Sequence, residues 1–133
     1  MGAYVEAVQT GNLLFLTGML PLAGGKPKHL GRLGAELDLE AGRDAAYTAC
    51  LNALATAKAY LGSLDKVTRV VRLGVFVATA PDFREYPKLA DAASELLESV
   101  FGKERTSSRI VPGVASLPLG MPVELEVILE VAP

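Results

Sequence analysis

The clearest regularity in the chain is an alternation of apolar and polar residues close to its C-terminus. Valine and leucine occupy every second position there, at Val123, Leu125, Val127, Leu129 and Val131. The positions between them hold Glu124, Glu126, Ile128 and Glu130. A period of two residues indicates a β-strand with one buried face. The pattern therefore predicts a strand over residues 121–131 that carries its carboxylates on the opposite face.

Four other segments favour strands, and one favours a loop. Runs of apolar residues predict strands over residues 4–8, 13–20, 67–78 and 109–116. The second of these runs is apolar on both faces. Residues 22–37 are rich in glycine and hold a loose basic cluster, which predicts a loop with one ordered turn. A Leu-Pro-Leu-Gly turn at residues 117–120 would join the last two strands.

Two segments have the spacing and end signals of helices. The first is predicted to begin at Asp38, a good N-cap residue, and to end at Gly62. Small and apolar residues recur along it at helical spacing. The second is predicted to begin at Asp82, where Glu85 three residues later resembles a capping box, and to end at Gly102.

The order of these elements is ββαβαββ, which predicts a single α+β domain over residues 1–133. Helices separated by single strands favour a mixed sheet with both helices packed on one face. Part of the other face is expected to be apolar, at Leu14, Leu16, Val70, Phe76 and Ile128. An apolar sheet face without helices must meet another surface, most simply a second copy of the chain. The pattern therefore predicts a homo-oligomer.

Composition narrows the class of protein. The chain is 50% apolar and its net charge is −2, which argues against nucleic-acid binding driven by phosphate contacts. No apolar run approaches the length of a membrane span, and residues 1–6 lack the pattern of a signal peptide. A single cysteine, Cys50, fits a reducing compartment. We therefore expect a soluble cytoplasmic protein that binds no membrane.

Metal sites, histidine-dependent triads and phosphate loops find no support in the sequence. His29 and Cys50 are the only histidine and cysteine, and they lie on different predicted elements. The Gly-Arg-Leu-Gly run at residues 31–34 lacks the ending of a phosphate loop and the strand that should lead into it. No metal site is therefore expected.

The charged residues of the last two predicted strands are the best candidates for chemistry. Arg109 opens a strand of small and apolar residues, and a guanidinium is the natural two-point partner of a substrate carboxylate. A salt bridge to a glutamate on the neighbouring strand explains it equally well. Glu124 and Glu126 would lie about 6.6 Å apart on one face, a spacing that suits either acid–base work or an ordinary solvated strand face.

Several short motifs, in one register and across nearly the whole chain, resemble the RidA/YjgF family. They are Tyr-Val-Glu-Ala-Val at 4–8, Gly-Asn-Leu-Leu-Phe-Leu-Thr-Gly at 11–18, Ser-Arg at 108–109, Leu-Pro at 117–118 and Val-Glu-Leu-Glu at 123–126. The runs at residues 31–35 and 83–88 look like those of a less-studied branch. The resemblance implies a chorismate-mutase-like α+β fold and a homotrimer with ligand sites in clefts between subunits.

The resemblance also implies a reaction. The best-understood members are enamine/imine deaminases, which hydrolyse 2-aminoacrylate-type intermediates to 2-oxo acids and ammonia without a cofactor. In their pattern Arg109 would bind the substrate carboxylate and Glu124 would position water. Tyr4, Thr17, Gly18 and Val111 would complete the ligand site, Thr17 standing where those members have a serine.

The chain departs from the deaminase pattern at three positions. Pro87 replaces an asparagine, Val111 a cysteine and Ser108 an alanine. The carboxylate anchor is thus kept while part of the pocket wall changes. The alternative is a non-catalytic trimer that binds a small carboxylate or regulates another protein. Some members carry ribonuclease or translation initiation inhibitor labels, and the acidic charge balance argues against that activity here.

Overall fold

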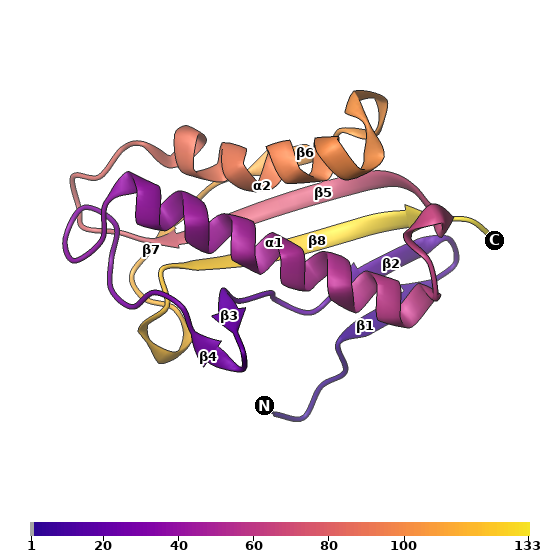
Figure 1. The fold of residues 1–133 in the computed structure, drawn as a ribbon, viewed down its shortest axis with the longest axis horizontal. Helices are drawn as coiled ribbons and strands as arrows, with labels where there is room; N and C mark the ends of the chain where they lie inside the picture. Colours follow the sequence, from indigo (N-terminus) through magenta and orange to yellow (C-terminus); the bar gives the residue numbers. More distant parts are fainter. Residues whose placement is uncertain (1) are drawn as a thin grey trace.

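Two helices lie side by side on one face of a mixed β-sheet in the computed structural model, which describes residues 2–133 (Figure 1). The helices are α1 (Leu39–Leu61) and α2 (Tyr86–Phe101). The sheet has the order β1-β2-β8-β5-β6, with β7 also paired to β5. Its strands are β1 (Ala7–Thr10), β2 (Leu13–Leu16), β5 (Val67–Ala78), β6 (Ser108–Ile110), β7 (Gly113–Val114) and β8 (Val123–Val131). The predicted α+β class, mixed sheet and one-sided helix layer are confirmed.

The predicted glycine-rich loop contains a small hairpin of its own. Strands β3 (Leu22–Ala23) and β4 (Lys26–Pro27) pair across Gly24 and Gly25, whose φ angles are 60° and 78°. Two consecutive positive φ angles are what a tight hairpin turn requires, and glycine adopts them without strain. The chain also forms short 3-10 helices at η1 (Leu64–Lys66), η2 (Lys103–Arg105) and η3 (Pro118–Gly120). No helix within residues 2–133 has the length and apolar character to cross a membrane.

The ends of α1 are as predicted, whereas α2 starts later. The Asp38 carboxylate accepts a hydrogen bond from the backbone N–H of Ala41 at 2.9 Å, and Gly62 ends the helix in the left-handed conformation. Helix α2 begins only at Tyr86, and Glu85 makes no side-chain cap. Proline is tolerated only in the first turn of a helix. A helix capped by Asp82 would place Pro87 beyond its first turn. Pro87 therefore favours a helix that begins at Tyr86.

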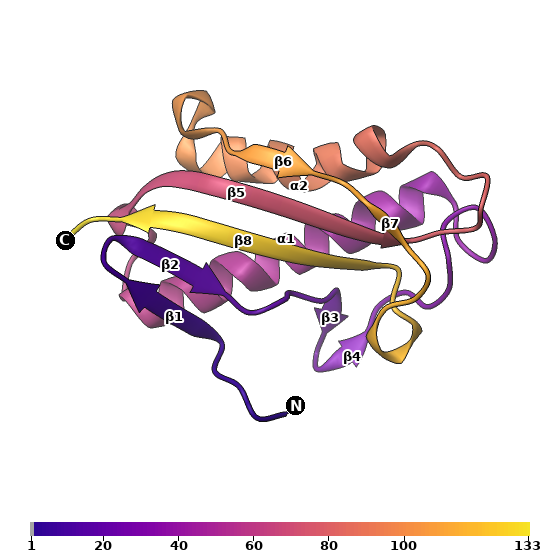
Figure 2. The ribbon, with the colours of Figure 1, turned by 180° about the vertical axis from the view of Figure 1, so that it is seen from behind.

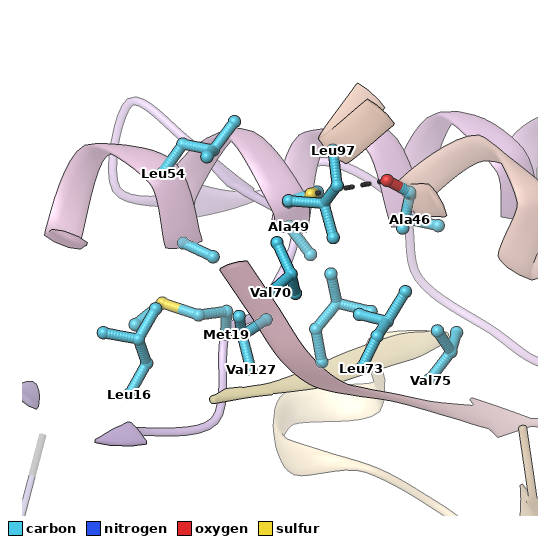
Figure 3. Close-up of a cluster of buried hydrophobic side chains, with 14 of the residues drawn as sticks. Leu16, Met19, Ala46, Ala49, Leu54, Val70, Leu73, Val75, Leu97 and Val127 are labelled. Atoms are coloured by element: carbon cyan, nitrogen blue, oxygen red, sulfur yellow. Dashed lines mark hydrogen bonds between the residues drawn. The ribbon is translucent and has the colours of Figure 1, made fainter. Parts of the chain in front are cut away.

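The core lies between the helices and the alternating apolar face of β8 and β5. Small residues of α1, including Ala46 and Ala49, let this helix lie close to the sheet, and Leu97 of α2 closes over Val70 and Leu73 of β5 (Figure 3). At Gly42 of α1 an added Cβ would lie only 2.4 Å from the Leu89 Cδ1 atom of α2, so the two helices leave no space there for a side chain. A single core thus holds one sheet face and both helices together.

The last two predicted strands, which residues 117–120 join, are not neighbours in the sheet. Strand β5 lies between them, antiparallel to β8 and parallel to β6 and β7. The predicted strand over residues 109–116 is split in two around Pro112, which has no N–H to donate to a ladder. Because β5, α2 and β6 form a β-α-β unit, β6 pairs in parallel with β5 and not with β8.

Among residues 2–133, no helix covers the other sheet face (Figure 2). This face is partly apolar, but three of the residues predicted for it lie elsewhere. Leu14, Leu16 and Val70 belong to the buried core beneath the helices. The uncovered face instead presents Val8, Phe15, Phe76, Ile110 and Ile128. Strand β2 is apolar at all four positions, so its phase could not be read from the pattern, and a bulge in β5 shifts the register beside Val70. The homo-oligomer remains a prediction.

The N-terminal strands are shifted from their expected bounds. Strand β1 covers Ala7–Thr10 rather than residues 4–8. Strand β2 ends at Leu16, where residues 13–20 were expected. The chain nevertheless stays beside β8 after this end, because Met19 forms an isolated antiparallel bridge with Leu125. This return brings the residues between Leu16 and Met19 against β8.

Candidate functional site

Glu124 lies on the uncovered face of the sheet, in a pocket of about 240 Å³. It sits between Val123 and Leu125, which are buried on the helix side, and it is level with Phe76 of β5. The pocket is lined by Leu16, Gly18, Phe76, Leu117, Glu124, Leu125 and Glu126. Burial raises the pKa of the Glu124 carboxyl above its ordinary value, because desolvation disfavours the charged form.

The carboxylate of Glu124 rests directly against Gly18. The backbone N–H of Met19 donates to the Leu125 carbonyl, and the Leu125 N–H donates to the Met19 carbonyl, both at 2.8 Å. This pair of bonds holds Gly18 beside Glu124. A Cβ added to Gly18 would lie only 2.2 Å from the Glu124 Oε2 atom. Glycine is therefore the residue that leaves room for the carboxylate at this point.

A second pocket, of about 220 Å³, adjoins Gly18 as well. Tyr4, Thr17 and Gly18 line it, so three residues expected at the ligand site lie together there. Glu6 also lines it, and its Oε2 accepts a hydrogen bond from the Thr56 hydroxyl at 3.4 Å. Gly18 is thus shared by the pocket that holds Glu124 and the pocket that holds Tyr4.

The neighbouring carboxylates of β8 have partners of their own. The Arg72 Nε atom donates to Glu126 Oε1 at 2.9 Å, across the pairing of β5 with β8. Glu130 accepts a hydrogen bond from the Thr68 hydroxyl at 2.7 Å. Glu126 lines the pocket, but its charge is balanced by Arg72. Within residues 2–133, Glu124 takes part in no ion pair.

Arg109 points away from this pocket, to the helix side of the sheet. It is level with Leu73, a fully buried residue of the core. Its Nη1 atom donates to Asp91 Oδ1 at 2.9 Å and to the Ser94 hydroxyl at 3.1 Å, both on α2. The sequence left open a substrate carboxylate or a strand glutamate as its partner. The observed partner is a carboxylate, but it comes from a helix.

Arg109 and Glu124 do not meet within one chain. Strand β5 separates their strands, and their side chains lie on opposite faces of the sheet. Strand spacing and rise place their Cα atoms about 14 Å apart. Val111, two residues after Arg109, packs against the core rather than against Glu124. One chain therefore brings Glu124, Gly18, Thr17 and Tyr4 into adjoining pockets and leaves Arg109 and Val111 at another place.

His29 and Cys50 form no metal site. The His29 Nε2 atom lies within hydrogen-bond distance of Asp44 Oδ2 on α1, at 2.7 Å, and Lys28 Nζ forms an ion pair with the same carboxylate oxygen at 2.9 Å. Cys50 is buried, and burial raises the pKa of its thiol to about 12. Among residues 2–133 no group of three or more His, Cys, Asp or Glu side chains is placed to hold a metal ion.

The sequence alone did not indicate that Asp91 and Ser94 lie beside Arg109. Asp91 and Ser94 are three positions apart on α2 and therefore lie on one side of that helix. The signal that could have found them is the β-α-β unit itself. A crossover helix packs over the strands that it connects, so polar residues on its inner edge face the last of those strands.

The chain is similar to known proteins over almost its whole length. Residues 1–129 match the family model described as "YjgF/chorismate_mutase-like, putative endoribonuclease". Protein TCP17 of Trypanosoma cruzi is 41% identical over 96% of this chain and 80% of its own length. A 2-iminobutanoate/2-iminopropanoate deaminase of Dermatophagoides farinae is 30% identical over 97% of this chain and 86% of its own.

A solved structure has the same fold as this chain. The crystal structure of the protein Atu1372 of unknown function from Agrobacterium tumefaciens superposes with a TM-score of 0.94. It is 38% identical, over 96% of this chain and 81% of that chain. The family model spans nearly all of the strands and both helices described above. The chain therefore belongs to the YjgF/RidA family.

Proposed function

We propose that the protein is a cofactor-independent, deaminase-like hydrolase of small imino acids of the 2-aminoacrylate type. Its products would be 2-oxo acids and ammonia, and its sites would lie between the subunits of a homotrimer. The observation that carries the proposal is Glu124, a half-buried carboxylate with a raised pKa and no ion-pair partner among residues 2–133. Such a group is suited to accept a proton from water.

The chemistry follows from this carboxylate. Glu124 accepts a proton from a water molecule as the water oxygen attacks the carbon of the C=N bond. Starting from the protonated imine, this gives a carbinolamine, and the same proton then passes from Glu124 to the nitrogen. The C–N bond breaks as the hydroxyl O–H gives its proton to Glu124 and the C=O bond forms, and ammonia leaves with that proton as ammonium. Imines hydrolyse readily in water, so positioning supplies most of the acceleration required. Thr17 and the backbone at Gly18 would hold the departing nitrogen or the substrate carboxylate.

A second copy of the chain would supply the carboxylate anchor. Arg109 lies at the β6 edge of the sheet and Glu124 lies on the uncovered face, so one chain cannot place both on one small substrate. The uncovered face is apolar at Phe15 and Ile110, which are 40% and 44% exposed. An apolar face of this kind favours association. In such an assembly the β6 edge of one subunit, which carries Arg109, would lie against the uncovered face of the next, which carries Glu124.

A relative supports the choice of substrate class. The Dermatophagoides farinae protein, 30% identical over 97% of this chain, is named a 2-iminobutanoate/2-iminopropanoate deaminase. Both of those substrates are small imino acids with one carboxylate. A single arginine and a single unpaired glutamate match a substrate of this size and charge.

The test measures release of 2-oxo acid from a threonine dehydratase and its amino-acid substrate. Wild type should accelerate release, and Arg109→Ala and Glu124→Gln should each remove most of the acceleration. Mixing the two variants under conditions of subunit exchange should restore about a quarter of the sites of a randomly assembled trimer. Equal rates for wild type and buffer would reject the activity. Active wild type without recovery in the mixture would reject the shared site.

One observation favours a second candidate, a non-catalytic trimer that binds small carboxylates. Arg109 already has a carboxylate partner in Asp91 and a hydroxyl partner in Ser94. An arginine held in this way can bind a ligand without any reaction following. Binding of 2-oxobutanoate by wild type, with no acceleration of imine hydrolysis, would select this candidate over the deaminase.

A further inference from the structure

The hydrogen bonds of Arg109 use one corner of its guanidinium group. A guanidinium has five N–H donors: two on Nη1, two on Nη2 and one on Nε. The two N–H groups of Nη1 are used, because Nη1 donates to Asp91 Oδ1 at 2.9 Å and to Ser94 Oγ at 3.1 Å. Within residues 2–133 neither Nε nor Nη2 forms a hydrogen bond.

The donors that remain form the edge suited to a carboxylate. Nε–H and one Nη2–H are parallel, and together they match the two oxygens of one carboxylate in a bidentate pair. The Arg109 side chain is 26% exposed, so part of the group is within reach of a ligand. A freely rotating guanidinium would present its several edges in turn. One held at Nη1 presents the Nε–Nη2 edge continuously.

We infer that Asp91 and Ser94 are positioning residues, which hold Arg109 by Nη1 and present its Nε–Nη2 edge to the carboxylate of a small monocarboxylic substrate. This inference rests on the proposed function, since it assigns the partners of the arginine in that site. The two acceptors reach Arg109 from one side of α2, a helix fixed to the core through Leu89 and Ala93. The arginine is therefore oriented by a rigid element rather than by a loop.

The purely structural alternative is an ion pair that joins α2 to the sheet. Asp91 is 47% exposed, and pairs so open to solvent contribute little to stability. A matched pair on the same helix allows comparison, because Glu95 Oε1 accepts from Arg43 Nη2 of α1 at 3.1 Å. Glu95→Ala removes a comparable contact between an arginine and a carboxylate of α2, and it leaves the contacts of Arg109 in place.

The experiment compares Asp91→Ala, Ser94→Ala, Asp91→Asn and the control Glu95→Ala. The first two are expected to weaken 2-oxobutanoate binding at least fivefold in titrations followed by NMR. Imine hydrolysis should fall by a similar factor at low dehydratase flux and return to within twofold of wild type at high flux. Asp91→Asn keeps an acceptor oxygen and should recover part of the loss. Glu95→Ala should match wild type, and the thermal midpoints of all four should agree within a few degrees.

The outcomes separate the inference from the function. Unchanged binding in Asp91→Ala would overturn the inference, and so would tighter binding, since Asp91 would then compete with the ligand for Arg109. Equal losses of binding in Asp91→Ala and Glu95→Ala would show that the contact between Asp91 and Arg109 has only a structural role. Wild type that binds 2-oxobutanoate through Arg109 but hydrolyses no imine would overturn only the proposed activity. Wild type that binds no 2-oxobutanoate would overturn the inference.

Discussion

Replacing Gly18 with alanine would displace the Glu124 carboxylate while leaving the backbone conformation acceptable. The added Cβ would lie 2.2 Å from Glu124 Oε2, where ordinary contacts begin at 3.4 Å, so the oxygen must move by about 1.2 Å. Gly18 has no left-handed φ angle that would strain an alanine. A misplacement of about 1 Å at a reacting group can lower the rate about 100-fold, equivalent to about 2.7 kcal/mol.

The assay is 2-oxo acid release in the dehydratase-coupled reaction, with thermal unfolding measured in parallel. Gly18→Ala should lose activity about 100-fold with only a small change in melting temperature, because the far end of a flexible side chain can move away. If the loss acts through Glu124, the double variant Gly18→Ala/Glu124→Gln should be no less active than Glu124→Gln alone. Full activity in Gly18→Ala, or additive losses in the double variant, would refute this reasoning.

Three further predictions concern stability. Burial raises the pKa of Glu124 in the folded protein, so folding favours its protonated form, and stability falls as pH rises from the ordinary glutamate pKa through the raised one. Glu124→Gln should therefore have a higher urea midpoint than wild type at pH 7 and lose that advantage in acid. An equal difference at both pH values would contradict the prediction. Asp38→Ala removes the acceptor for the Ala41 N–H and should lower the free energy of unfolding by about 1 kcal/mol in urea titrations; an unchanged midpoint would mean that water replaces the cap. Leu125→Ala empties a fully buried position and should lower it by about 2–5 kcal/mol; a loss well under this range would indicate that the core closes around the space.

The parts of the fold that could be predicted are those where one face of an element is buried and the other is not. Strand β8 alternates strictly, so its phase and its buried face follow from the pattern. Strand β2 is apolar at every position, and nothing in its sequence distinguishes the helix side from the uncovered side. The separation of the last two predicted strands by β5 could not be predicted, for a different reason. Pairing between strands is a long-range choice, and a turn between them does not determine it.

The candidate site was harder to predict because its residues come from distant segments. Glu124 and Gly18 belong to separate motifs, and their contact depends on the bridge between Met19 and Leu125. The position of Arg109 depends on the parallel pairing of β6 with β5, which no local pattern reveals. Once α2 is placed over these strands, Asp91 becomes a neighbour of Arg109 without any further assumption.

The burial of Cys50 gives the protein a practical property. It is the chain's single cysteine, and a thiol with a pKa of about 12 inside an apolar core has almost no thiolate to react at neutral pH. A spin label or fluorophore can therefore be attached at one chosen surface position without first removing the native thiol. Ile110→Cys on the uncovered sheet face would report directly, through distances between labels, how copies of the chain assemble.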